Sequence, residues 1–232
     1  MLFFSVISLA FFTIGLPTFE RKGAIYLYTT LDSLLLNASK SIENYIKIVI
    51  LLSDTNTRNK IQLLKLLENK YGRYMEQGSV QVIQIPAKAY PPLHGIYRTL
   101  GDSQDRMYWR SKQAIDFAFL MQYCQHFSPY YLQLEDDVIA IRNYDVHIRN
   151  FVIKMEGSYW FNLDFTNLGF IGKFYRSETL AKQARFFRVF YSALPVDFLL
   201  HAYRALLGND DSRNTYDMNI FEHIGHESSS FG

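Results

Sequence analysis

Hydrophobic runs of strand length alternate along the chain with longer amphipathic segments. The run YIKIVILL is almost continuously apolar, which is typical of a strand buried on both faces of a sheet. A helix is predicted between Trp109 and Cys124, because one set of side chains recurs there at three- and four-residue steps. The set is Trp109, Gln113, Asp116, Phe117, Leu120 and Cys124. These patterns predict strands at 11–16, 45–52, 79–85, 130–135 and 159–165, and helices at about 23–38, 57–70, 103–127, 143–156, 176–192 and 195–207.

Alternation of strand and helix predicts an α/β protein, with a Rossmann-like, mainly parallel sheet covered by helices on both faces. The Pro-rich segment 86–95 is too short and too aromatic for a flexible linker, so it is interpreted as a loop. We therefore expect one domain over 11–232, preceded by a hydrophobic extension over 1–10.

The first sixteen residues carry no charge, which leaves two interpretations of the N-terminus. One is a buried first strand, FFTIGL, preceded by extra hydrophobic residues. The other is a signal segment or membrane anchor, although the run is shorter than the roughly 20 residues that span a bilayer and lacks a positive flank. Both remain open.

Composition narrows the classes of function only slightly. The formal net charge of +2 gives no indication of a nucleic-acid partner, and we expect none. Cys124 is the only cysteine, which excludes an intrachain disulfide and a cysteine-based metal site.

Polar residues follow several of the predicted strands: Thr18 the first, Asp54 the second and the acidic triplet Glu135-Asp136-Asp137 the fourth. Because ligands of open α/β sheets bind beyond the carboxyl ends of the strands, these residues should share one crevice. Adjacent carboxylates suit a hard divalent cation that also binds substrate phosphates. The alternative is a solvated loop.

The segment GDSQDRMYWRSKQ (101–113) begins with a turn and a helix N-cap. Arg106, Arg110 and Gln113 follow at spacings of four and three, so they share one helix face. Arginine suits phosphate oxygens, which makes this face a counterpart for a metal-bound diphosphate. The alternative is a solvated basic face.

Several blocks together resemble the N-acetylglucosaminyltransferase IV family, the α-1,3-mannosyl-glycoprotein 4-β-N-acetylglucosaminyltransferases. The blocks stand in order from about residue 11 to the end: FFTIGLPTFER, GDSQDRMYWRSKQAIDFAFLMQY, YYLQLEDDVIAIRNY, LDFTNLGFIGKFY, LPVDFLL and FEHIGHESS. This resemblance implies a GT-A fold and inverting transfer of N-acetylglucosamine from UDP-GlcNAc to a core mannose of N-glycans, forming a β-1,4 linkage. It also implies Mn²⁺ as cofactor and a membrane-associated location in the Golgi lumen.

The resemblance implies roles for individual residues. Asp137 is the first choice for direct Mn²⁺ ligation, while Asp136 is a further metal candidate that, like Glu135, could instead reach the ribose or a metal-bound water. The candidates for the diphosphate, the uridine or the nucleotide's edge are Thr18, Arg21, Asp54, Arg106, Arg110, Lys112 and Gln113.

Inverting transfer needs one base to take the proton of the acceptor hydroxyl. Asp197 in LPVDFLL is the first candidate, and Asp164 in NLDF, where the family usually has Glu, is the second. Against Asp197 stands a structural interpretation, because an Asp in a first helical turn is stabilised by the helix dipole anyway.

The tail FEHIGHESS departs from the family pattern FQH-V-G-x-His-Ser-Ser. His223 matches, but His226 comes one place early and Glu227 stands where the second histidine is expected. Both are candidates for a second metal ligand. The departure also supports an alternative, in which the chain is a weak or inactive homologue that binds nucleotide sugar or regulates another glycosyltransferase.

Overall fold

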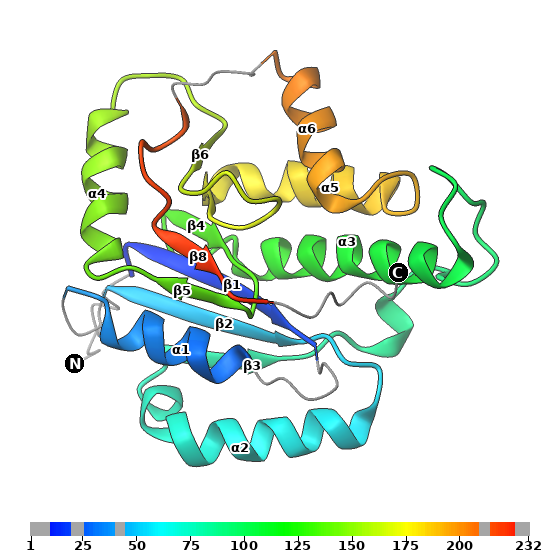
Figure 1. Ribbon diagram of the computed structural model, residues 1–232, viewed down its shortest axis with the longest axis horizontal. Helices are drawn as coiled ribbons and strands as arrows, with labels where there is room; N and C mark the ends of the chain where they lie inside the picture. The colour runs from blue at the N-terminus through cyan, green and yellow to red at the C-terminus, as the bar shows by residue number, and fades with distance from the viewer. Residues whose placement is uncertain (1–9, 20–25, 40–44, 209–213, 226–232) are drawn as a thin grey trace, which may run out of the picture.

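The computed structural model describes residues 10–19, 26–39, 45–208 and 214–225. Its main sheet has the strand order β3-β2-β1-β4-β7-β6 (Figure 1). The strands are β1 (Phe12–Thr18), β2 (Ile46–Leu52), β3 (Val80–Ile83), β4 (Tyr130–Gln133), β6 (Asn162–Asp164) and β7 (Lys173–Arg176). Strands β1 to β4 are parallel, and β7 lies antiparallel between β4 and β6. A separate antiparallel pair joins β5 (Val138–Ala140) to β8 (Phe221–His223).

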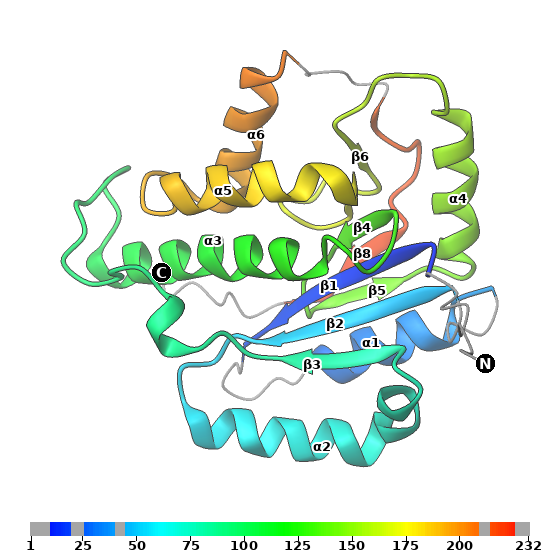
Figure 2. The ribbon, with the colours of Figure 1, turned by 180° about the vertical axis from the view of Figure 1, so that it is seen from behind.

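Helices pack on both faces of this sheet. One buried cluster joins its first face to α1 (Tyr26–Leu36), α2 (Thr57–Glu76) and α4 (Tyr144–Lys154). A second cluster joins the other face to α3 (Gln104–Cys124), α5 (Leu180–Phe190) and α6 (Val196–Leu206). Figures 1 and 2 show α2 and α3 on opposite sides of β1 and β2. The predicted α/β architecture is confirmed.

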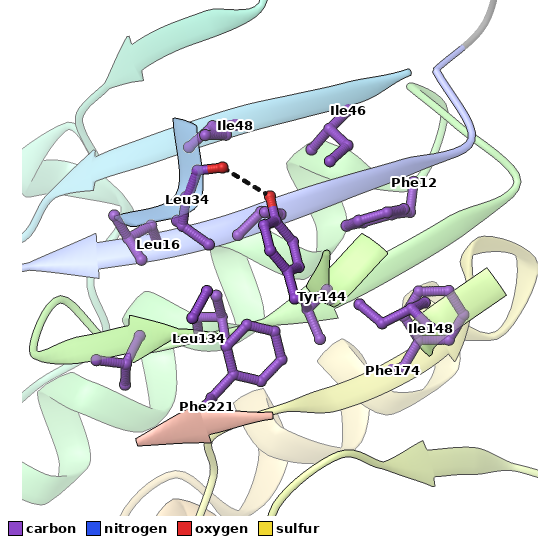
Figure 3. Close-up of a cluster of buried hydrophobic side chains, with 14 of the residues drawn as sticks. Phe12, Leu16, Leu34, Ile46, Ile48, Leu134, Tyr144, Ile148, Phe174 and Phe221 are labelled. Atoms are coloured by element: carbon purple, nitrogen blue, oxygen red, sulfur yellow. Dashed lines mark hydrogen bonds between the residues drawn. The ribbon is translucent and has the colours of Figure 1, made fainter. Parts of the chain in front are cut away.

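Strand β2 shows how an apolar run produces this layering. Ile46, Ile48 and Ile50 belong to the first cluster, whereas Val49 and Leu51 belong to the second. In Figure 3, Tyr144 of α4 stands among the side chains of the first cluster, and its hydroxyl donates a 3.1 Å hydrogen bond to the Leu34 carbonyl oxygen. A polar tip inside this cluster is therefore satisfied.

Gly15 allows β1 and β4 to pair closely at the centre of the sheet. A Cβ atom at this position would overlap the ring of Tyr131 on β4. The Tyr131 hydroxyl donates to Gln133 Oε1 at 2.6 Å, and Gln133 Nε2 donates to the Leu134 carbonyl oxygen at 2.7 Å. This packing sets the register Gly15 to Gln133, which brings the acidic triplet beside the end of β1.

All five predicted strands are present, with shifted ends, but β5, β7 and β8 were not predicted. Strands β5 and β8 pair with each other from distant parts of the chain, and β7 runs antiparallel between β4 and β6, so the alternation of strand and helix does not predict them. The predicted helix at 176–192 begins with a short 3₁₀ turn, η3 (Ser177–Thr179), before α5, and another, η2 (Ala87–Ala89), lies in the Pro-rich loop. The expected extension over 1–10 falls almost wholly outside the described residues.

Candidate active site

The carboxyl ends of β1, β2 and β4 meet at one edge of the sheet, where Figures 1 and 2 show the arrowheads of β1 and β2 together. Two pockets open there and share Thr18, Phe19 and Asp136. The α3 pocket is lined by Pro17, Thr18, Phe19, Ser53, Trp109, Lys112, Gln113, Asp116, Phe117, Glu135 and Asp136. The α1–α2 pocket is lined by Thr18, Phe19, Tyr26, Leu27, Leu52, Asp54, Asn59, Lys60, Gln62, Leu63, Leu66 and Asp136.

Asp136 stands between the two pockets and is almost fully buried. Its Oδ2 accepts hydrogen bonds from Thr18 Oγ1 at 2.6 Å and from the Phe19 amide at 3.2 Å. Its carbonyl oxygen accepts from Thr30 Oγ1 at 2.7 Å. The predicted neighbours Thr18 and Asp136 are thus in direct contact, and the hydroxyl fixes the carboxylate at the strand edge.

Asp137 is also buried, and it contacts a residue from the far end of the chain. His223 Nε2 lies 3.2 Å from Asp137 Oδ2. The contact depends on the β5–β8 pair, which places Val138 opposite His223, and on the Ile224 amide, which donates to the Asp137 carbonyl oxygen at 2.9 Å. His223 matches the family pattern in the sequence, but that pattern alone predicted no role for it.

Gly225 closes this corner. A Cβ atom there would overlap Asp137 Oδ2 and come within 2.9 Å of His223 Nε2. Among the described residues, no three His, Cys, Asp or Glu side chains converge as a metal-binding group. A carboxylate and an imidazole nevertheless suit Mn²⁺, because phosphate oxygens and water complete such sites. The donor set of Asp137 and His223 therefore fits the expected metal. His226, Glu227 and Arg21 lie outside the described residues.

Lys112 lines the α3 pocket, but its charge already has a partner. Its Nζ donates to Asp116 Oδ2 at 2.7 Å and to the Ser53 carbonyl oxygen at 2.5 Å. The Tyr90 hydroxyl donates to Asp116 Oδ1 at 2.5 Å. Burial raises the pKa of Asp116, and Lys112 opposes that rise. Burial also raises the pKa of Tyr90, with the Asp116 charge adding to the effect.

Arg106 and Arg110 do not line either pocket. Arg106 Nε lies 2.9 Å from Asp102 Oδ1, and Arg110 Nε lies 2.8 Å from Asp102 Oδ2. Arg110 is buried, and burial lowers its pKa while Asp102 opposes the change. Among the predicted residues of α3, Lys112 and Gln113 face the α3 pocket, whereas the two arginines pair with the turn before the helix.

Asp54 lines the α1–α2 pocket and also accepts hydrogen bonds from the start of α2, whose N-cap is Asn56. Its Oδ1 accepts from the Asn56 amide at 2.7 Å, and its Oδ2 accepts from Asn59 Nδ2 at 3.3 Å. Lys60, which sequence reasoning missed, lines the same pocket. The signal that could have indicated Lys60 is its position at the start of an amphipathic helix that follows a strand end.

Asp164, the second candidate base, is engaged by cations. Arg204 Nη2 donates to both of its carboxylate oxygens at 2.7 Å, and Lys173 Nζ lies 3.4 Å from Oδ1. Burial lowers the pKa of Lys173, with Asp164 opposing that effect. Arg204 Nε also donates to Asn162 Oδ1 at 2.9 Å. These contacts join β6 to the last turn of α6, which indicates a structural role.

Asp197, the first candidate base, lies half-buried in the first turn of α6. Among the residues that the structure describes, its carboxylate has no hydrogen-bond or ion-pair partner. Figures 1 and 2 show α3 between α6 and the strands β1 and β2, and the amino end of α6 is the end nearer to α3. Asp197 is not among the residues that line the α3 pocket or the α1–α2 pocket.

The fold and the acidic strand end define this chain as a GT-A-type domain. A crystal structure of S. aureus TarS 1–349 in complex with UDP-GlcNAc aligns with a TM-score of 0.52 and 14% identity, over 95% of this chain and 60% of that one. At that identity the likeness shows the fold alone, and it confirms the predicted fold class.

A sequence profile described as the MGAT4 conserved region matches residues 6–232. The mouse α-1,3-mannosyl-glycoprotein 4-β-N-acetylglucosaminyltransferase C is 36% identical over 222 residues, which are 96% of this chain and 46% of the mouse protein. The rat transferase A is 34% identical over 231 residues, covering 94% of this chain and 44% of the rat protein. The chain belongs to the MGAT4 family, as predicted, and spans about half the length of these relatives.

No helix within the described residues is both long and apolar enough to cross a membrane.

Proposed function

We propose that this chain is a metal-dependent glycosyltransferase unit that transfers N-acetylglucosamine from UDP-GlcNAc to a core mannose of N-glycans. The observation that carries the proposal is the buried Asp137 beside His223, at the edge where Asp136 separates two pockets, in a chain of the MGAT4 family. The relatives' names and the TarS complex with UDP-GlcNAc support the donor and the transferred group. By the same family likeness we propose a β-1,4 linkage, and a membrane-associated location in the Golgi lumen.

We assign the nucleoside to the α3 pocket. Trp109 and Phe19 meet there edge to face at 4.6 Å and offer aromatic surface to a planar base, while Gln113 and Glu135 offer groups for hydrogen bonds. Diphosphate oxygens would then point toward Asp136 and Asp137. Asp137 and His223 would hold Mn²⁺, which supplies charge stabilisation for the departing UDP.

Inverting transfer is a single displacement, so one base takes the proton of the acceptor hydroxyl as the glycosidic bond to UDP breaks. We assign this proton to Asp197, because its carboxylate has no partner among the described residues. Asp164 is the weaker candidate, since Arg204 occupies both of its oxygens. A base must have a lone pair available within reach of the acceptor hydroxyl.

Transfer from UDP-GlcNAc to a biantennary N-glycan in the presence of Mn²⁺ tests this proposal. We expect turnover by the wild type, a loss of at least about 100-fold in Asp197→Asn, as for removal of a general base, and retained turnover in folded Asp164→Asn. The alternative, an inactive nucleotide-sugar-binding homologue, is supported by the departure of His226 and Glu227 from the family pattern in the sequence. Binding of UDP with Mn²⁺ but without transfer would establish that alternative.

A further inference from the structure

Lys112, Asp116 and Tyr90 form a buried network in the wall of the α3 pocket. Lys112 and Asp116 are both at least 96% buried, with 3% and 4% of their surfaces exposed. A lysine ammonium has three protons to donate, and Lys112 donates to the Asp116 carboxylate and the Ser53 carbonyl oxygen. The Tyr90 ring lies 5.1 Å from the same ammonium. The charge of Lys112 is therefore compensated without any ligand.

The network holds the carboxyl end of β2. Ser53 is the residue that follows β2, and its carbonyl oxygen is the acceptor for Lys112. The Ser53 amide donates to the Thr18 carbonyl oxygen at 2.9 Å, at the end of β1. Thr18 in turn donates its hydroxyl to Asp136. A continuous chain of hydrogen bonds thus leads from Lys112 to the carboxylate between the two pockets.

Tyr90 extends the network to the loop after β3. The residue lies just beyond η2 in the Pro-rich segment, and its hydroxyl reaches Asp116 on α3. The loop, α3 and the end of β2 are therefore joined at one buried carboxylate. A phosphate that approached Lys112 would meet the Asp116 carboxylate 2.7 Å from the ammonium, which opposes anion binding at this point.

We propose that Lys112 is a positioning residue, which forms the nucleoside pocket by fixing Ser53 and Thr18, and that it does not bind the diphosphate. This inference rests on the proposed function, which assigns the nucleoside to the α3 pocket. It distinguishes two roles that sequence alone cannot separate. A phosphate ligand contributes more to UDP than to uridine, whereas a positioning residue contributes equally to both.

Calorimetric titration of uridine, UMP and UDP into the whole chain with Mn²⁺ tests the inference. In Lys112→Met we expect the affinity for all three ligands to fall by a similar factor, about tenfold or more, the effect of one lost charged hydrogen bond. A loss for UDP that exceeds the loss for uridine by tenfold would overturn the positioning role. If the wild type binds none of the three, the donor-site proposal fails and this inference falls with it.

Two further measurements keep the test decisive. Trp109 lines the same pocket, and in a Trp160→Phe background it is the one remaining tryptophan of the sequence. Quenching of its fluorescence by uridine should weaken when Lys112→Met is added. Unchanged quenching contradicts the inference. If Lys112→Met does not fold, Tyr90→Phe replaces it, because this variant keeps the lysine charge and removes one hydrogen bond of the network. Equal losses for all three ligands support positioning, and wild-type affinities contradict it.

Discussion

The ion pair between Asp164 and Arg204 decides whether Asp164 is a structural residue or a reacting one. Only 13% and 15% of the two side chains are exposed. Arg204→Met removes one charged donor from Asp164 and one hydrogen bond to Asn162. A hydrogen bond to a charged group contributes about 1.5–3 kcal/mol and an ordinary one about 0.5–1.5 kcal/mol. Because Lys173 still compensates part of the Asp164 charge, we expect a loss of about 2–4 kcal/mol in the free energy of unfolding.

Urea unfolding followed by circular dichroism measures this loss, provided that the slope with denaturant stays unchanged. Lys70→Met is the matched control, because Lys70 pairs with Asp32 at the same 2.7 Å distance but with 47% and 41% of the side chains exposed. Exposed pairs contribute about 0–1 kcal/mol, so the control should lose little. If Arg204→Met loses no more than Lys70→Met, the pair does not anchor α6 and the structural interpretation of Asp164 is refuted.

Two further predictions concern the acidic edge and the single thiol. Gly225→Ala should weaken Mn²⁺-dependent UDP binding, because the added Cβ would displace Asp137 or His223. Gly72→Ala is the control: its Cβ would meet open space in α2, so binding should stay unchanged and the fold should gain about 0.5–1 kcal/mol of stability. Wild-type binding by Gly225→Ala would contradict this geometry. Cys124 is buried, and burial raises the pKa of its thiol. We therefore expect no labelling of Cys124 by iodoacetamide at pH 8 in the native protein and rapid labelling in urea. Labelling at equal rates in both states would contradict the buried placement.

The sequence predicted the sheet and the edge that carries the site because both follow from local patterns. Apolar runs such as β2 predict strands, and the topology rule places the residues after parallel strands together. Thr18 and Asp136 were brought together in this way, and the structure joins them by a hydrogen bond.

The remaining features depend on contacts that no local pattern contains. The contact of His223 with Asp137 spans 86 positions and requires the three-residue strands β5 and β8. Asp164 meets Arg204 across 40 positions, and this contact anchors the carboxylate of the second candidate base. Helical spacing grouped Arg106 with Arg110, but it could not show that Asp102 in the preceding turn pairs with both.

The measurement that tests the central claim most directly is the Mn²⁺ dependence of UDP affinity in the wild type, in His223→Ala and in His201→Ala. His201 lies exposed on α6, away from the acidic edge, and serves as the control. We predict that Mn²⁺ strengthens UDP binding in the wild type and in His201→Ala, and that this enhancement falls at least about tenfold in His223→Ala, as for removal of a group that supports a metal. Equal enhancement in all three proteins would contradict the assignment of Asp137 and His223 as the metal-binding edge of the donor site.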